Sequence, residues 1–192
     1  MHAIRRGAIA LVCLSILAAP ERTVFIADTA VHETPTAEQL ADIAIQSAEQ
    51  VRQLGHEPRV AFLSYSNFGN PMRESAKHIR DAVRLLRERD VDFEYDGEMQ
   101  ANIALDSALM RRFFPFAKLS GPANVLIMPG LHSANIVAKL IPRIGGGSVV
   151  GPILIGLSKP AQVVQLGATV NDLVIAAAIA AHEAELEQQA LL

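Results

Sequence analysis

A cluster of small polar residues follows an apolar segment near position 60. Val60–Leu63 is short and apolar, which predicts a buried strand. The residues after it offer hydroxyl groups, a side-chain amide and free backbone N–H groups, which bind phosphate or pyrophosphate oxygens. Loops between strands and helices also favour these residue types, so an ordinary loop stays an alternative. The candidates for binding an anionic substrate are Ser64, Ser66, Asn67 and Gly69.

Other chemistries are poorly represented in the sequence. The six histidines are scattered without HExxH spacing, and the single cysteine, Cys13, cannot form an internal disulfide, so we expect no metal site. The net charge of −3 and the absence of Trp argue against nucleic acid or an acidic membrane as a partner. No Gly-x-Ser-x-Gly sequence or Ser/His/Asp spacing indicates a hydrolase.

The polar residues need a scaffold, and the chain alternates between segments typical of strands and helices. The alternation predicts βαβ units, and therefore an α/β fold with a mostly parallel sheet and flanking helices. Short apolar runs predict strands at 23–27, 60–63, 93–95, 125–128 and 152–157. Apolar residues at helical spacing predict helices from Thr36 to Gly55 and at 74–89, 103–113, 133–144 and 171–190.

Polar clusters follow four of the predicted strands. In open α/β sheets, ligands bind at the carboxyl ends of the strands, so these clusters are expected to converge on one site. The clusters are 64–70, 96–100, 130–135 and 158–159. Gly145–Gly147 precedes a strand rather than a helix, so it predicts a turn rather than a phosphate-binding loop.

The first 22 residues differ from the rest. Arg5 and Arg6 precede an apolar run from Gly7 to Ala18, a pattern that is typical of a secretory signal but shorter than a membrane-spanning helix requires. We favour the alternative of a mis-started reading frame, because the remaining sequence is typical of a cytoplasmic protein. The expected organisation is thus an anomalous leader at 1–22 and a domain at 23–192.

Five segments together resemble the phosphate acetyl/butyryltransferase (phosphotransacetylase) family in order and spacing. SNFG at 66–69 is more similar to the copies fused to the C-terminus of NADP-dependent malic enzymes than to stand-alone enzymes. The segments are FIADTAVHETPTAEQLADIAIQSAE (25–49), VAFLSYSNFGN (60–70), DGEMQANIAL (96–105), ANVLIMPGLHSANIVAKL (123–140) and GPILIGLSKPAQVV (151–164).

The resemblance implies a two-lobed fold similar to isocitrate and isopropylmalate dehydrogenases, of which this chain would lack the N-terminal lobe. It implies acyl transfer between coenzyme A and phosphate without metal or other cofactor, with coenzyme A or acetyl-CoA as substrate or effector. Asp172 falls at the position of the family's catalytic aspartate, which takes the thiol proton. The further substrate-binding residues implied are Asn135, Lys159, Gln165 and Gly167.

One departure from the family concerns the reaction itself. Active members carry a Ser-Arg-Gly triplet where this chain has Gln165-Leu166-Gly167, so the serine and arginine that support the phosphate and the oxyanion are missing. Three functions stay open. They are a catalytically degenerate domain that binds acetyl-CoA and regulates a malic enzyme, an active phosphate acetyltransferase, and an oligomerisation scaffold. We expect a homo-oligomer in each case, with the Ala-rich helix as a possible interface.

Overall fold

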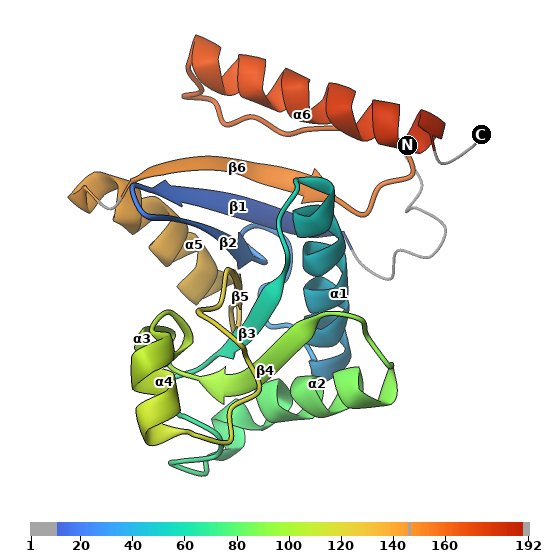
Figure 1. The fold of residues 1–192 in the computed structure, drawn as a ribbon. Coiled ribbons are helices and arrows are strands. Elements are labelled where there is room, and N and C mark those ends of the chain that lie inside the picture. Colours follow the sequence, from blue (N-terminus) through green and yellow to red (C-terminus); the bar gives the residue numbers. More distant parts are fainter. Residues whose placement is uncertain (1–10, 146, 190–192) are drawn as a thin grey trace.

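The structure is a computed structural model that describes residues 11–145 and 147–189. These residues form a six-stranded sheet with helices on both faces (Figure 1). The strands are β1 (Val12–Ala19), β2 (Arg22–Ala27), β3 (Arg59–Leu63), β4 (Glu94–Met99), β5 (Val125–Ile127) and β6 (Ser148–Ile155). The helices are α1 (Ala37–Gln53), α2 (Lys77–Glu88), α3 (Ala101–Ala104), α4 (Ser107–Phe113), α5 (Leu131–Leu140) and α6 (Val170–Gln189), with the short 3₁₀ turns η1 (Glu74–Ala76) and η2 (Ile141–Ile144).

The sheet confirms the predicted α/β class. The strand order is β4-β3-β5-β2-β1-β6, and β2, β3, β4 and β5 are parallel to their neighbours within that group. β1 runs antiparallel to both β2 and β6, so β6 points in the same direction as β2. The carboxyl ends of β2, β3, β4, β5 and β6 therefore all lie on the same side of the sheet, as the sequence predicts.

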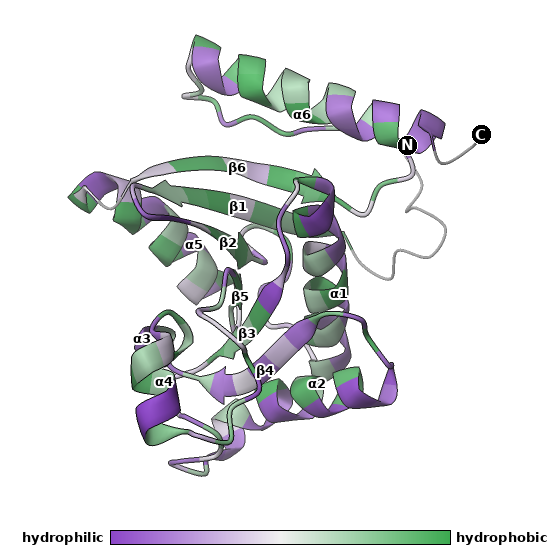
Figure 2. Cartoon of the chain, in the orientation of Figure 1, coloured by the Kyte–Doolittle hydropathy of each residue, from purple (hydrophilic) through white to green (hydrophobic). Residues whose placement is uncertain are grey.

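Two apolar clusters cover the two faces of the sheet. One combines strand residues with α1 and α2, including Phe25, Phe62 and Leu86. The other combines the opposite strand faces with α3, α4 and α5, including Ile26 and Met110. Figure 2 shows the resulting pattern, with largely hydrophobic central strands and mixed polarity along α2. Burial on both faces explains why β2, β3 and β5 are largely continuous apolar runs rather than alternating ones.

α1 begins where the sequence predicts. Thr36 forms a capping box, in which its hydroxyl accepts from the backbone N–H of Gln39 and its own N–H donates to the Gln39 side chain. α1 also packs against α2, and Arg89 just after α2 donates a hydrogen bond to the buried Asp42. This local signal made the start of the helix predictable to within one residue.

Part of the predicted leader belongs to the sheet. Val12–Ala19 is β1, paired with β2 on one side and with β6 on the other, and Val12 and Leu14 are fully buried. The domain therefore includes residues placed in the leader rather than beginning at 23. An apolar run of eight residues fits a buried strand as well as a signal segment, and only its pairing partners decide. Residues 1–10 lie outside the described residues, as do Gly146 of the predicted turn and residues 190–192 at the end of the last helix.

A second difference concerns the acidic cluster at 96–100. It was expected after a strand, but Asp96 and Glu98 lie within β4 and are buried. Their carboxylates have partners, since Asp96 accepts from the N–H groups of Gly97 and Lys118, and Glu98 accepts from the Arg80 guanidinium. Such pairing makes charged residues tolerable inside a strand.

Candidate functional site

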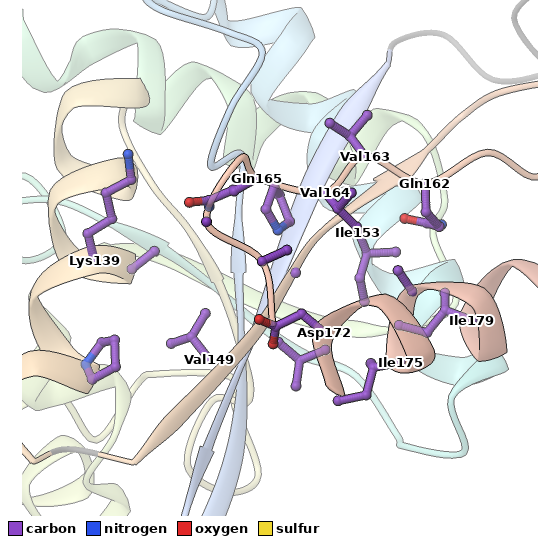
Figure 3. A pocket seen from close by; sticks show the side chains of 18 of the residues that line it. Lys139, Val149, Ile153, Gln162, Val163, Val164, Gln165, Asp172, Ile175 and Ile179 are labelled. Carbon is purple, nitrogen blue, oxygen red and sulfur yellow. The ribbon is translucent and has the colours of Figure 1, made fainter. Parts of the chain in front are cut away.

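A pocket of about 700 Å³ lies between the outer edge of β6, the C-terminal end of α5 and the N-terminal half of α6 (Figure 3). This volume is in the range of small-molecule sites. The segment 162–168, which leads back from the sheet to α6, forms another wall. The polar residues that line it are Lys139, Arg143, Gln162, Gln165 and Asp172, and the larger apolar ones are Val149, Val150, Ile153, Val163, Val164, Ile175 and Ile179.

The two ends of the pocket differ in character. Lys139, Arg143 and Asp172 are exposed, and Figure 3 places Lys139 on α5 on one side with Asp172 toward the middle. On the other side, Ile153 is buried, and Ile179 is half-buried and packs against the core. The pocket thus has an open, cationic mouth and a sheltered, apolar end. This polarity suits a ligand with an anionic group and a short apolar group.

Asp172 lines the pocket but also holds the start of α6. Its carboxylate accepts hydrogen bonds from the N–H and from the hydroxyl of Thr169, each with a donor–acceptor distance of 2.8 Å. Its own N–H donates to the Thr169 hydroxyl at a distance of 3.2 Å. These hydrogen bonds, from the Thr169 backbone first, lower the pKa of Asp172. A lowered pKa makes a carboxylate a weaker base, which counts against proton transfer from a thiol. The catalytic role of Asp172 stays a prediction, beside a capping role that the geometry shows.

The segment that carries the family departure borders the same pocket. Gln165 and Gly167 line it, and a tight turn closes between them as the N–H of Ala168 donates to the Gln165 carbonyl over 3.0 Å. Leu166 is completely exposed. Lys159 is exposed and is not among the described residues that line the pocket. The structure therefore brings Gln165, Gly167 and Asp172 together, and it adds Lys139 of α5 and Arg143 of η2, two cations that no sequence motif indicates.

The predicted phosphate-binding loop lies elsewhere. β3 and β6 are separated by β5, β2 and β1, four spacings of about 4.8 Å or roughly 19 Å. Within the loop, Ser66 and the N–H of Gly69 donate to Glu98, and the Ser64 and Ser66 hydroxyls lie 3.1 Å apart. Asn67 accepts from the N–H of Gln100 over 2.8 Å. These contacts give the residues a structural role, and phosphate binding by this loop stays a prediction.

Another polar cluster follows β2, and it was not predicted from the sequence. Asp28 is buried, and one of its oxygens accepts from the N–H groups of Cys13, Ala30 and Val31. Its other oxygen accepts from the N–H of His32 and lies 2.7 Å from the His32 ring. Asn135 on α5 donates to the nearby Thr29 carbonyl over 3.3 Å, so it anchors this loop to the helix. An Asp directly after an apolar strand was the available signal. The group organises the loop rather than lining the pocket.

Over 11–145 and 147–189, no group of three or more His, Cys, Asp or Glu side chains is placed to hold a metal ion. Over the same residues, no helix combines the length and hydrophobicity required to cross a membrane. The first turns of α6 expose Val170, Leu173 and Val174, and an oligomer interface there stays a prediction.

The fold and the pocket together define an α/β domain with a pocket beside the edge strand β6. The family described as "Phosphate acetyl/butaryl transferase" matches residues 3–181, and the chain belongs to this family. The match begins within the predicted leader, in agreement with the position of β1 in the sheet. The family assignment made from the sequence is confirmed.

Relatives of two kinds are similar to the chain. It is 51% identical over 171 residues to the NADP-dependent malic enzyme of Rhizobium meliloti, covering 89% of this chain and 22% of that protein. It is 44% identical over 162 residues to the phosphate acetyltransferase of Treponema pallidum, covering 82% of this chain and 48% of that protein. The chain thus spans about a fifth of the length of the malic enzymes that it matches.

Solved structures agree with the assignment. The EutD phosphotransacetylase from Staphylococcus aureus is 29% identical with a TM-score of 0.87, covering 94% of this chain and 56% of that one. A phosphotransacetylase from Streptococcus pyogenes is 29% identical with a TM-score of 0.89, covering 95% and 56%. The remaining 44% of these structures has no counterpart in the superposition.

Proposed function

We propose that this domain binds acetyl-CoA or a related short acyl-CoA, does not transfer the acyl group, and serves as the regulatory region of an NADP-dependent malic enzyme. The single observation that carries the proposal is the pocket that joins Lys139 and Arg143 to Gln165, Gly167 and Asp172. It has room and charge for a ligand, but not the side chains that the family uses for the reaction. The similarity to malic enzymes supplies the proposed setting.

Binding is supported by the distribution of charge. Coenzyme A esters combine phosphate groups with an apolar acyl group, and the pocket combines a cationic mouth with an apolar end. Lys139 and Arg143 lie one turn apart at the end of α5 and in η2, so both can face one anionic group. Charge-assisted hydrogen bonds from such residues are the usual means of holding phosphate.

The absence of transfer is supported by two features. Gln165 and Leu166 stand where the family's active members have Ser and Arg, and the loss of one positioned oxyanion donor costs roughly 3–4 kcal/mol in transition-state stabilisation. Asp172 is held by Thr169, which lowers its pKa and weakens it as a base. Together these changes are expected to reduce turnover by more than a thousandfold.

An active phosphate acetyltransferase is the second candidate. The observation that favours it is the presence of Lys139 and Arg143 in the pocket, since either could replace the missing arginine as a charge for phosphate. Similarity to the Treponema pallidum phosphate acetyltransferase adds to it. The two candidates differ in one measurable respect, because only the second consumes acetyl-CoA when phosphate is present.

The binding proposal is tested by equilibrium dialysis with acetyl-CoA. We expect the double variant Lys139→Ala/Arg143→Ala to bind at least tenfold more weakly than the wild type, because two charge-assisted contacts are lost. Arg111→Ala and Arg112→Ala together remove the same charge from an exposed face of α4, away from the pocket, and serve as the control. Equal loss in both double variants would reject the assignment of this pocket. Phosphate-dependent loss of the thioester, followed in the same samples, separates the two candidates.

A further inference from the structure

Gln162 occupies an unusual position at the apolar end of the pocket. Its side-chain oxygen accepts from the N–H of Leu154 over 3.0 Å, and its side-chain nitrogen approaches the Leu154 carbonyl at 3.5 Å. The amide therefore pairs with the outer edge of β6 as a neighbouring strand would. That edge is the last one in the strand order, so Gln162 occupies backbone groups that no strand of the described sheet reaches.

The same amide is tied to α6. Gln162 Nε2 donates to Glu183 Oε2 over 3.1 Å, and the other oxygen of Glu183 accepts from Gln50 on α1 over 3.4 Å. Both oxygens of Glu183 and both polar atoms of the Gln162 amide are thus engaged with protein groups. Glu183 and Gln162 are half-buried, and Ile179, one turn before Glu183, packs against the core.

Gln162 and Glu183 together form a polar wall at the apolar end of the pocket. Ile153, Ile175 and Ile179 line this apolar compartment, and Figure 3 shows Gln162 beside Ile153 on the side of the pocket opposite Lys139. An apolar chain that extended past these residues would have to displace hydrogen bonds between Gln162, Glu183 and the β6 backbone. It could not replace them, because a methylene group neither donates nor accepts.

We propose that Gln162, held by Glu183, is the residue that limits the length of the acyl chain that this domain accepts. The proposal rests on the proposed function, since it assumes that the ligand is an acyl-CoA with its anionic part at Lys139 and Arg143 and its acyl group at Ile153, Ile175 and Ile179. Gln162 is a specificity-determining residue in this account, and it takes no part in acyl transfer.

The expected size of the effect follows from burial of methylene groups. Each additional CH₂ that is buried raises affinity about fourfold, so two of them raise it about sixteenfold in an unobstructed channel. If Gln162 ends the compartment, the gain stops when the chain reaches it. Hexanoyl-CoA should then bind to the wild type no more tightly than butyryl-CoA, although it is the more hydrophobic ligand.

The test is calorimetric titration of the wild type and of Gln162→Ala with acetyl-, butyryl- and hexanoyl-CoA. We expect Gln162→Ala to bind hexanoyl-CoA at least fourfold more tightly than butyryl-CoA, and the shorter Gln162→Asn to show a smaller change in the same direction. Gln188→Ala, an exposed glutamine on α6, is the matched control and should keep the wild-type ratio. Gln162→Asn keeps an amide at this position, so it gives a result even if the alanine variant does not fold.

The outcomes separate the two proposals. An equal preference for hexanoyl-CoA in the wild type and both Gln162 variants would overturn the chain-length assignment and leave acyl-CoA binding standing. An absence of heat with all three esters in the wild type would overturn both. A changed ratio in Gln188→Ala would also overturn the assignment, because the effect would then not belong to Gln162.

Discussion

The Arg80 guanidinium donates to Glu98 Oε1 over 3.2 Å, and Glu98 is completely buried in β4. The same oxygen accepts from Ser66 and from the N–H of Gly69. This carboxylate therefore joins β4, α2 and the loop after β3. Truncation of one partner of a buried pair leaves a charge without compensation, which is more costly than the loss of the pair as a whole.

We expect Arg80→Met to lower the free energy of unfolding by about 3 kcal/mol. The double variant Arg80→Met/Glu98→Gln should recover part of that loss, because the buried charge is removed together with its partner. Urea denaturation measures both. Arg84→Met is the control, since its ion pair with Asp81 is exposed and should contribute less than about 1 kcal/mol. A loss in Arg80→Met as small as in the control would contradict this role for Glu98.

Thr169 and Asp172 stabilise the start of α6 through reciprocal hydrogen bonds. Thr169→Ala and Asp172→Ala should each destabilise the protein, and the double variant by clearly less than the sum, because both changes remove the same contacts. Thermal unfolding of the four proteins gives the coupling. Additive losses would show that the two residues act independently.

Cys13 should be almost unreactive in the folded protein. Burial, and then the nearby Asp28 carboxylate, raise the pKa of its thiol from 9.0 to about 12. Since the thiolate is the reactive form, labelling by a thiol reagent at neutral pH should be slow in the native state and rapid after unfolding in urea. Cys13 is the only cysteine of the sequence, so the assay reports on it alone. Rapid native labelling would contradict the placement of β1 inside the sheet.

The sign of the pH effect for Cys13 follows from the raised pKa. Between pH 9.0 and about 12 the folded protein keeps a proton that the unfolded chain has lost, so stability falls as pH rises through this window. Cys13→Ala removes this contribution. The difference in the free energy of unfolding between the wild type and Cys13→Ala should therefore shift against the wild type above pH 9.0.

Glu183 should make stability depend on pH in the acidic to neutral range. Burial is the main cause that raises its pKa, the Gln162 amide opposes it, and Glu187 adds to it. The folded state therefore holds the proton to a higher pH than the unfolded chain, so this stabilising contribution is complete at low pH and is lost as pH rises through the raised pKa. Relative to the wild type, Glu183→Gln should gain stability as pH rises.

Unfolding of Glu183→Gln at several pH values measures this difference. Glu185→Gln, which removes an exposed charge from the same helix, is the matched control. A stability difference that does not change with pH, or one that changes equally in the control, would contradict the half-buried position of Glu183 between Gln50 and Gln162.

Much of the fold could be predicted from local patterns in the sequence. Thr36 and Gln39 lie three residues apart, and the side chain of each accepts a hydrogen bond from the backbone N–H of the other. The start of α1 could therefore be predicted without the rest of the chain. β1 could not be predicted from its local sequence in this way. Its apolar run follows two arginines, and whether it is a signal or a strand depends on pairing with β2 and with β6, more than a hundred residues later in the chain.

The candidate site depended even more on distant contacts. The polar loop after β3 resembled a phosphate site because its residue types suit anions, but Glu98, some thirty residues away, takes its donors. Conversely, no sequence motif marks Lys139 and Arg143, and only the course of the chain back along β6 brings them to the same pocket as Asp172. Spacing along the sequence does not encode such proximity.

The most direct test of the central claim is a calorimetric titration of acetyl-CoA into the protein in phosphate buffer. We predict a saturating isotherm in which the baseline returns after every injection, as expected for binding without turnover. A continuing heat signal that scales with protein concentration and disappears without phosphate would contradict the account, because the domain would then be an active acyltransferase. An injection series without binding heat would contradict it as well, because the pocket would then not hold acetyl-CoA.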